Sequence, residues 1–464
     1  MFLNINKKER ALIAAIDDSG RQISYGELVE ASVDFERVIG KRTLIFIFSE
    51  NVIGSLVGYV ASLAARVVPL IISTNTERSL YLKLIDTYLP EYIWVPDACV
   101  ADFTYEVIFS KYGYTLLRTN HVAPILFEDL SLLLPTSGST GSSKLVRHSY
   151  RNIEANAENV ASFFGFTAKD RGLAILPMHY TMGLSVITSH LWTGATVLLV
   201  KKSMLDRDFW TFFKEQKATN FTGVPYSFEI LKKLRFTRME LPDLQIISQG
   251  GGKMNKEMFA FFAEYAKTTG KKFIATYGQT ECTARMAFLP SELACEKTGS
   301  IGNAIPNGKL YLIDDKGMVI DKPYIEGQLV YEGENVTLGY AYSAMDLSKG
   351  DENHGIMETG DIAFKDSDEC YFIVGRKSRF LKLFGYRVGL DECEAFIKEA
   401  YNIDCACVGN DDYMNIYITD VSLKEQIQNL LVIKTNLIAS VFNIIGIDVI
   451  PKNESGKTLY SELN

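Results

Sequence analysis

The sequence has no run of basic residues, and its net charge is −8, with acidic and basic residues interspersed along 464 residues. Such a charge distribution gives no electrostatic basis for binding nucleic acid or an anionic membrane. Internal repeats and low-complexity tracts are also absent from the sequence. The length allows about three domain-sized units, each with a core of its own. The composition therefore indicates an ordinary globular protein whose partners must be inferred from individual sites.

Cysteine is scarce and scattered. Of seven cysteines only Cys405 and Cys407 are close neighbours, and no histidine cluster accompanies them. This excludes a disulfide framework and a zinc site, and it favours a reducing compartment. Residues 1–10 carry polar and charged side chains where a signal peptide requires an apolar core. We therefore expect the protein to be cytoplasmic.

Long apolar runs are rare. Residues 52–72 are nearly apolar over about the length of a membrane span, but Arg66 and Pro69 interrupt them. We expect a buried helix that leads into a strand, and no membrane partner.

Apolar segments alternate between strand-like and helix-like patterns over most of the chain. Residues 43–48, 52–65 and 67–72 read as strand, helix and strand, which implies parallel pairing, and the alternation resumes from 152 to 276. Short strands with turns follow between about 300 and 375. The sequence thus predicts an α/β fold with a β-rich subdomain: a large N-terminal domain, 1–375, and a small mobile α+β C-terminal domain, 376–464.

One loop has the composition of a phosphate-binding segment. A strand-like apolar run ends in small hydroxyl and glycine residues closed by Lys144, so backbone N–H groups, hydroxyls and an ammonium can converge on one anion. A Walker-type loop is excluded by spacing, because Ser143 precedes the lysine and Leu145 follows it. A kinase is disfavoured for the same reason.

The loop resembles the phosphate loop of the adenylate-forming (ANL) superfamily, which includes acyl-CoA synthetases and stand-alone adenylation domains. Ser143 and Leu145 replace the usual proline and glycine of that motif. The resemblance implies that the β- and γ-phosphates of ATP contact Thr136, Ser137, Gly138, Ser139, Thr140, Gly141 and Lys144.

A second motif, Tyr277-Gly278-Gln279-Thr280-Glu281, directly follows an apolar strand, where open α/β sheets bind ligands. It resembles the superfamily's Tyr-Gly-x-Thr-Glu motif. By this resemblance Tyr277 stacks on adenine, Thr280 contacts the α-phosphate, and Glu281 holds Mg²⁺. The upstream glycines Gly250, Gly251 and Gly252 resemble the adenine-binding segment.

Three more matches follow in the family order. Asp361, in Thr-Gly-Asp, would accept hydrogen bonds from both ribose hydroxyls, and Arg376 would contact ribose or phosphate. Ser378 stands where the family usually has a hinge aspartate. Lys457, in Ser-Gly-Lys, would be the catalytic lysine, carried by the small domain and delivered by rotation about residues 376–379; a second rotation would bring in residues 382–387.

The acid-binding pocket is less readable. The family resemblance places Tyr180, Gly183 and Gln249 there, and no aspartate stands between 176 and 190 to pair an α-ammonium group. An α-amino acid substrate is thus disfavoured. His148 fits either a structural or a functional role.

The resemblance predicts ATP-dependent activation of a carboxylic acid to an acyl-adenylate, with release of pyrophosphate. Transfer to a pantetheine thiol, of CoA or a separate phosphopantetheinyl carrier protein, would follow. Catalysis would rest on Lys457, Glu281 and Thr280 with Mg²⁺ as cofactor. Two alternatives stay open: a non-catalytic ATP- or AMP-binding module, and an adenylating ligase with a non-thiol acceptor such as an amine.

Overall fold

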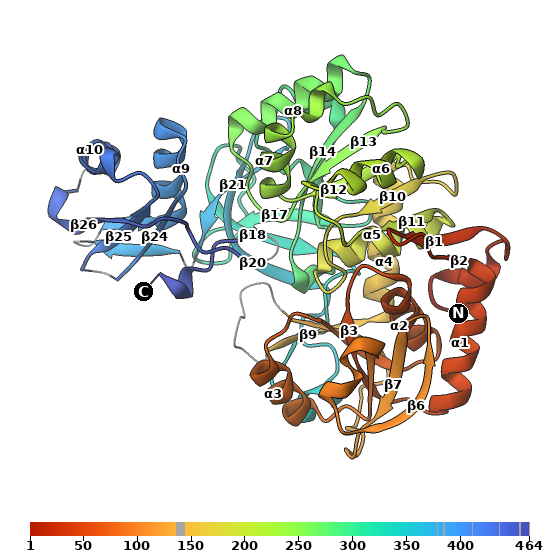
Figure 1. Cartoon of the computed structure of the whole chain (residues 1–464). Helices are drawn as coiled ribbons and strands as arrows, with labels where there is room; N and C mark the ends of the chain where they lie inside the picture. The colour runs from red at the N-terminus through yellow and green to blue at the C-terminus, as the bar shows by residue number, and fades with distance from the viewer. Residues whose placement is uncertain are drawn as a thin grey trace.

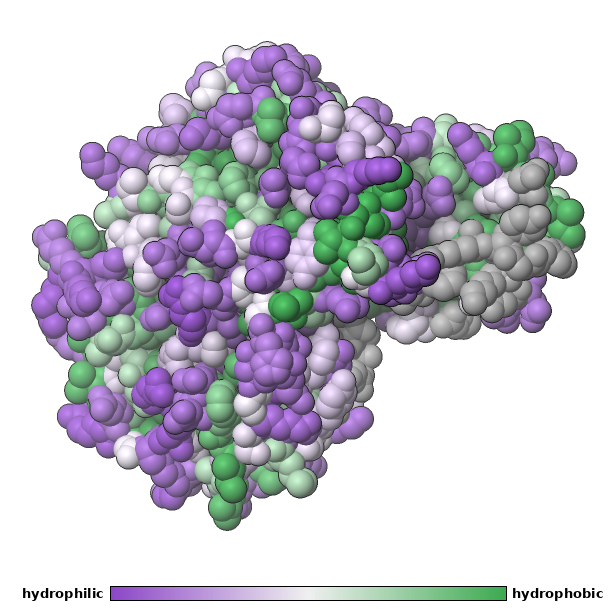
Figure 2. Space-filling view, turned by 180° about the vertical axis from the view of Figure 1, so that it is seen from behind, coloured by the Kyte–Doolittle hydropathy of each residue, from purple (hydrophilic) through white to green (hydrophobic). Residues whose placement is uncertain are grey.

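The computed structural model describes residues 1–135, 144–377, 379–383, 386–410, 412–435, 437–453 and 456–463, with the backbone alone at 380, 382, 386 and 387. In these residues a large body of two sheets and flanking helices carries a small domain at one side (Figure 1). Figure 2 shows the small domain projecting from the large body, whose visible face is mainly hydrophilic.

The first large sheet has nine strands. Their order is β16 (Asn303–Ala304), β15 (Ala287–Leu289), β14 (Lys272–Tyr277), β13 (Ile246–Gln249), β12 (Asn220–Gly223), β10 (Arg171–Ala174), β11 (Thr196–Leu199), β1 (Ile13–Asp17) and β2 (Gln22–Ser24). The strands from β14 to β1 run parallel, and antiparallel strands close both edges.

The second large sheet has eight strands. Their order is β19 (Tyr340–Ala341), β9 (Leu145–Ser149), β8 (Leu130–Pro135), β4 (Val68–Ser73), β3 (Leu44–Ser49), β5 (Tyr92–Pro96), β7 (Tyr114–Arg118) and β6 (Glu106–Lys111). The pairs β8–β4, β4–β3 and β3–β5 are parallel.

Helices form three layers around these two sheets. The middle layer comprises α1 (Tyr25–Ile39), α2 (Ile53–Ala64), α4 (Tyr150–Phe164) and α5 (Thr181–Thr193), whose buried side chains share one core with residues of both sheets. The outer face of the nine-stranded sheet is covered by α6 (Arg207–Glu215), α7 (Pro225–Lys233) and α8 (Lys256–Thr268), and that of the other sheet by α3 (Arg78–Tyr88).

Local sequence signals explain several boundaries. Helix α1 begins with a capping box, in which the Ser24 hydroxyl accepts from the Glu27 N–H and the Glu27 carboxylate accepts from the Ser24 N–H. Helix α2 lies almost wholly inside the middle layer, as the apolar run 52–72 predicts. Among the described residues, no helix combines the length and the apolar character that crossing a bilayer requires.

A four-stranded antiparallel sheet follows, with β17 (Lys309–Ile313), β18 (Gly327–Glu332), β20 (Ile356–Lys365) and β21 (Tyr371–Arg376). The small domain contains the hairpin β22 (Phe380–Leu383) and β23 (Tyr386–Gly389), the helices α9 (Leu390–Tyr401) and α10 (Lys424–Thr435), and the sheet β24 (Cys405–Gly409), β25 (Met414–Ile418) and β26 (Phe442–Gly446). The predicted fold class, a large α/β part with a β-rich subdomain and a small α+β part, is confirmed. The mobility and the boundary at 375/376 stay predictions.

Candidate active site

The site lies where three parallel strands end. Strands β12, β13 and β14 are in register, with Gly223 opposite Gln249 and Gln249 opposite Ala275, so their carboxyl ends meet at one edge of the sheet. The chain leaves β13 into the glycines 250–252 and leaves β14 into the predicted Tyr277–Glu281 motif. This is the edge at which open α/β sheets bind ligands.

Two glycines are needed here because the backbone is crowded. A Cβ atom on Gly278 would lie 1.4 Å from the Ala284 carbonyl oxygen, and one on Gly251, whose φ is +75°, would lie 2.5 Å from the Tyr180 hydroxyl. The Gln249 amide is buried and donates to the Gly252 carbonyl at 2.7 Å. Gln249, predicted in the acid pocket, thus holds the shape of the glycine segment.

Asp361 is the centre of a hydrogen-bonded group. It lies directly across the β20–β21 ladder from Arg376, whose Nε is 2.8 Å from Asp361 Oδ1. The other carboxylate oxygen accepts from the Tyr277 hydroxyl and, at 3.1 Å, from the Gln279 amide. Burial raises the pKa of Asp361, although Arg376 opposes this rise. Tyr277 therefore bonds the predicted ribose-binding carboxylate through its hydroxyl.

Glu281 belongs to a second polar group. The Tyr340 hydroxyl donates to Glu281 Oε1 at 2.8 Å, and the Lys144 ammonium lies 3.4 Å from the centre of the Tyr340 ring. Lys144 directly precedes β9, so the end of the predicted phosphate loop reaches the same region as Glu281. Thr280, beside Glu281, accepts a hydrogen bond from the Thr181 hydroxyl at 3.0 Å.

The rest of the predicted phosphate loop, Thr136, Ser137, Gly138, Ser139, Thr140 and Gly141, lies outside the described residues. Its flanking strands β8 and β9 pair antiparallel, with Pro135 opposite Leu145. Ser378 and, within the predicted segment 382–387, residues 384 and 385 are likewise outside the described part of the chain.

The C-terminal segment brings Lys457 into the site. Its ammonium lies 5.8 Å from the centre of the Tyr180 ring, and its backbone N–H donates to the Asn453 side chain at 2.9 Å. A Cβ atom on Gly456 would lie 2.8 Å from Cβ of Tyr226 on α7, so this segment packs closely against the large domain. The salt bridge between Lys256 and Glu399, at 3.3 Å, joins the domains a second time.

The electrostatics of Lys457 reflect this position. Burial lowers the pKa of its ammonium, the positive Arg376 lowers it further, and the carboxylates of Glu281 and Asp361 oppose both effects. Lys457 and the three charges that act on it belong to residues that the sequence places in four separate motifs. The structure therefore brings the predicted lysine, ribose-binding and metal-binding residues together.

Sequence reasoning missed Arg285, which lies just beyond the Tyr277–Glu281 motif and is 1% exposed. Its guanidinium donates to the hydroxyls of Ser185 at 2.7 Å and Thr222 at 3.0 Å. A signal was present, since an arginine amid apolar and small residues is unusual. Gly183 lies in the first turns of α5, where the Leu176 and Pro177 carbonyls leave no room for a side chain.

His148 is fully buried, and desolvation lowers its pKa to about 3. Its Nδ1 lies 3.2 Å from the Thr283 hydroxyl. A neutral, enclosed imidazole on β9 fits the structural role that the sequence left open.

The fold and the site together define a class of protein: a nucleotide-binding α/β enzyme whose small domain inserts a lysine at the ligand edge of the larger sheet. The chain belongs to the AMP-binding enzyme family, whose model matches residues 4–341. The predicted family is thereby confirmed.

Among curated proteins, a 2-succinylbenzoate–CoA ligase of Staphylococcus epidermidis is 29% identical over 61% of this chain and 57% of its own length. A long-chain-fatty-acid–CoA ligase of Escherichia coli is 28% identical over 82% of this chain and 68% of its own. The chain thus spans little more than half the length of the staphylococcal ligase.

Solved structures share the whole fold. An O-succinylbenzoate coenzyme A synthetase (MenE) from Bacillus subtilis, in complex with AMP, superposes with a TM-score of 0.80 at 20% identity, covering 100% of this chain and 98% of that one. ATP-bound MatB from Rhodopseudomonas palustris gives a TM-score of 0.78 at 20% identity, over 100% and 98% of the chains. At this identity the likeness shows the fold.

Proposed function

We propose that the protein activates a carboxylic acid with ATP, forming an acyl-adenylate and pyrophosphate, and then transfers the acyl group to the thiol of CoA. The observation that carries this proposal is the position of Lys457, beside Tyr180 and within the electrostatic range of Glu281, Asp361 and Arg376. A module that only senses nucleotide has no need of a half-buried lysine supplied by a separate domain. The named activities of the curated relatives, both acid–CoA ligases, point the same way.

The chemical difficulty is that a carboxylate must attack the α-phosphorus of ATP while both are negative. Cations fixed where charge develops remove much of this barrier, because they need no reorganisation during the reaction. Lys457 would sit between the incoming carboxylate and the α-phosphate, and Lys144 would face the β- and γ-phosphates. Asp361 would fix the ribose through its two hydroxyls, which positions the phosphates against Lys457.

The residues at Glu281 fit a magnesium ion. Magnesium sites commonly combine one or two protein carboxylates with substrate phosphates and water. Glu281 would supply the protein ligand, because Tyr340 links its carboxylate to Lys144 at the end of the predicted phosphate loop. When bound, Mg²⁺ would neutralise charge on the phosphates. The Tyr340 hydroxyl, bonded to Glu281, would orient that carboxylate.

The position of Lys457 corresponds to the adenylation step. For thioester formation the small domain would rotate about residues 376–379, withdrawing Lys457 so that a pantetheine thiol can reach the acyl-adenylate. Arg379 would move with the small domain during this rotation, because it forms ion pairs with both Asp391 and Glu394 of α9. A carrier protein in place of CoA is an outcome that the assay below distinguishes.

We also place the protein in the reducing cytoplasm. All seven cysteines are free thiols, and five of them are buried, a state that a reducing compartment preserves.

The test is to measure the two half-reactions separately in Lys457→Ala. Adenylation should fall by at least a hundredfold, while thioester formation from supplied acyl-adenylate and CoA should stay within a few-fold of the unaltered protein. Lys434→Ala, which removes an exposed lysine from α10, should leave both half-reactions unchanged. Equal loss of both half-reactions in Lys457→Ala would overturn the proposal, and activity only with a pantetheinylated carrier would identify a different acceptor.

A further inference from the structure

Tyr340 joins the two groups that the proposed function assigns to the phosphates and to Mg²⁺. Its hydroxyl donates to Glu281 Oε1 at 2.8 Å, and the Lys144 ammonium lies 3.4 Å from the centre of its ring. The two contacts use different parts of the side chain, the hydroxyl at the tip and the face of the ring. A tyrosine hydroxyl keeps its proton at neutral pH and can donate to a carboxylate, and an aromatic face attracts an ammonium group. One half-buried side chain therefore contacts an anion and a cation at once.

Tyr340 is fixed to the strand that begins just after Lys144. Strand β19 pairs antiparallel with β9, which places Tyr340 opposite Val146. The Tyr340 carbonyl also accepts from Nε of Arg147 at 3.0 Å, and Arg147 is fully buried. Because Lys144 directly precedes β9, this strand pairing brings the ammonium and the ring together.

Glu281 reaches Tyr340 from the other large sheet. It lies in the segment after β14, which is a strand of the nine-stranded sheet, whereas β9 and β19 belong to the eight-stranded one. The Glu281 backbone carbonyl accepts from Thr337 twice, from its N–H at 3.0 Å and from its hydroxyl at 2.9 Å. Residues 337–341 are therefore bonded both to the Glu281 backbone and to β9. The Tyr340 hydroxyl and the Glu281 carboxylate thus meet at the junction of the two sheets.

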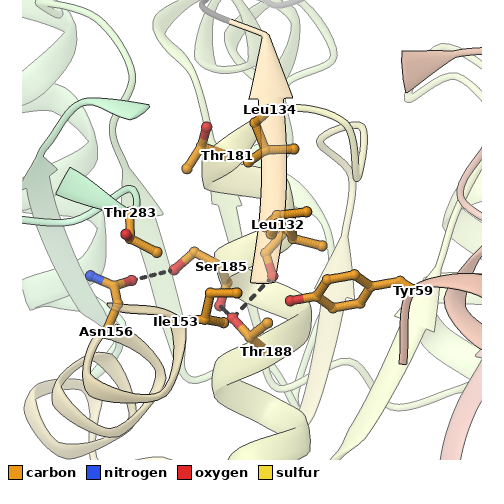
Figure 3. Close-up of a pocket in the computed structure, with 10 residues that line it drawn as sticks. Tyr59, Leu132, Leu134, Ile153, Asn156, Thr181, Ser185, Thr188 and Thr283 are labelled. Atoms are coloured by element: carbon orange, nitrogen blue, oxygen red, sulfur yellow. Dashed lines mark hydrogen bonds between the residues drawn. The ribbon is translucent and has the colours of Figure 1, made fainter. Parts of the chain in front are cut away.

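The two motifs also rest on one part of the core. Leu134 is on β8, the strand that leads toward the predicted phosphate loop, and Thr283 is two residues beyond Glu281. Both side chains line a cavity of about 10 Å³ together with Thr181, whose hydroxyl donates to Thr280 (Figure 3). Strand β8 and the segment that carries Glu281 are therefore neighbours, within reach of a single side chain.

We propose that Tyr340 is a positioning residue that couples the phosphate-binding Lys144 to the metal-binding Glu281. This inference rests on the nucleotide and metal part of the proposed function, because its ligand is ATP with Mg²⁺. The hydroxyl would hold the Glu281 carboxylate in one orientation, and the ring would hold the Lys144 ammonium on the side of the phosphates. Groups that are already in place need no reorganisation when the ligand arrives, so both contacts would strengthen its binding.

The first test is titration calorimetry of ATP with Tyr340→Phe, in EDTA and over a series of Mg²⁺ concentrations. This change keeps the ring and removes the hydroxyl. The Kd of ATP in EDTA should stay within about twofold, while the Mg²⁺ concentration for half-maximal tightening of ATP binding should rise about threefold to fivefold, because a group that orients a metal ligand is lost. Added to Glu281→Gln, the same change should have an effect of less than about twofold. Tyr342→Phe, an exposed tyrosine whose ring centre lies 6.5 Å from that of Tyr340, should change neither value.

The second test removes the ring. Tyr340→Leu should weaken ATP binding in EDTA by about threefold to tenfold, because the Lys144 ammonium loses the aromatic face. In a Lys144→Met background the same change should weaken binding by less than about twofold, since the cation is already gone. This double-mutant cycle separates the proposed coupling from a general loss of structure, which would act equally in both backgrounds.

Two results would overturn the inference. An unchanged Mg²⁺ requirement in Tyr340→Phe would remove the hydroxyl from the metal site, and equal losses for Tyr340→Leu with and without Lys144 would give the ring a structural role. Should Tyr340→Leu fail to fold, the Mg²⁺ requirement of Tyr340→Phe decides the inference. These titrations need no acid, so their failure would leave acid activation standing. Pyrophosphate exchange that fails with every acid would overturn acid activation alone.

Discussion

Replacing Asp361 with asparagine should weaken ATP binding by removing the charged acceptor for the ribose hydroxyls. The change keeps the size of the side chain and one oxygen, and the Tyr277 hydroxyl and Gln279 amide can still donate to that oxygen. The ion pair with Arg376 is lost, but Arg376 is 50% exposed, so that loss is worth no more than about 1 kcal/mol.

The effect on nucleotide affinity can be worked from the hydrogen bonds. A hydrogen bond to a charged group contributes about 1.5–3 kcal/mol, and a neutral one about 1 kcal/mol. Converting two charge-assisted ribose contacts into one neutral contact should therefore cost about 2–5 kcal/mol, a rise in Kd of about thirtyfold or more.

Isothermal titration with ATP and with 2′,3′-dideoxyATP checks the reasoning. The unaltered protein should prefer ATP by at least about a hundredfold, and Asp361→Asn should reduce the preference to about fivefold, because one neutral contact to the hydroxyls remains. Glu358→Gln, an exposed carboxylate on the same strand, is the matched control and should keep the preference. An undiminished preference for ATP in Asp361→Asn would refute the assignment of Asp361 to the ribose.

Three further predictions concern charge. The adenylation rate should decline as the pH rises through a value below 10.5, the pKa of an ordinary lysine, because Lys457 has a lowered pKa and loses its positive charge there. Lys457→Arg should shift this decline to higher pH. An unshifted pH profile would assign the decline to another group. Glu281→Gln should raise the Mg²⁺ concentration for half-maximal activity by about tenfold, whereas the exposed Glu332→Gln should not; equal values would remove Glu281 from the metal site. Arg147→Met should lower the free energy of unfolding in urea by about 3 kcal/mol, because a fully buried guanidinium that donates to the Leu338 and Tyr340 carbonyls is lost. Arg151→Met removes only the exposed ion pair with Glu334 and should lower the free energy of unfolding by under about 1 kcal/mol. Similar losses in both variants would contradict the burial argument.

Much of the large domain follows from local patterns in the sequence. The apolar run 52–72 predicts a buried helix and a strand, and the structure has α2 (Ile53–Ala64) and β4 (Val68–Ser73). Both helix and strand are enclosed on all sides, so hydrophobicity alone specifies them. The turn at Asp314 is equally local, because its carboxylate accepts from the Lys316 and Met318 N–H groups.

Other elements depend on distant partners. The N-terminal strands β1 and β2 escaped prediction, because β1 is held by β11, nearly two hundred residues away in the sequence. Strand β26 in the small domain pairs parallel with β25, and its five residues, with Asn443 as the one polar side chain, give a weak alternating signal. Such pairings are decided by tertiary contacts rather than by propensity.

In the candidate site, too, some residues are evident from local sequence and others only from their neighbours in the fold. Family motifs locate Asp361, Glu281 and Lys457, and the structure brings them together. Arg285 lies outside the motif positions, and Tyr340 ends a looser match to the family that assigns it no role. Their contacts are visible only in the structure: two buried hydroxyls for Arg285, and Glu281 with Lys144 for Tyr340. A single sequence does not record such neighbours.

The most direct measurement is acid-dependent exchange of labelled pyrophosphate into ATP with Mg²⁺, across short-chain, aromatic, hydroxy, amino and dicarboxylic acids. The account predicts exchange that requires one class of acid, is abolished in Lys457→Ala and persists in Lys434→Ala. Tight ATP binding with no exchange for any acid would contradict it and would leave a nucleotide-binding module in its place.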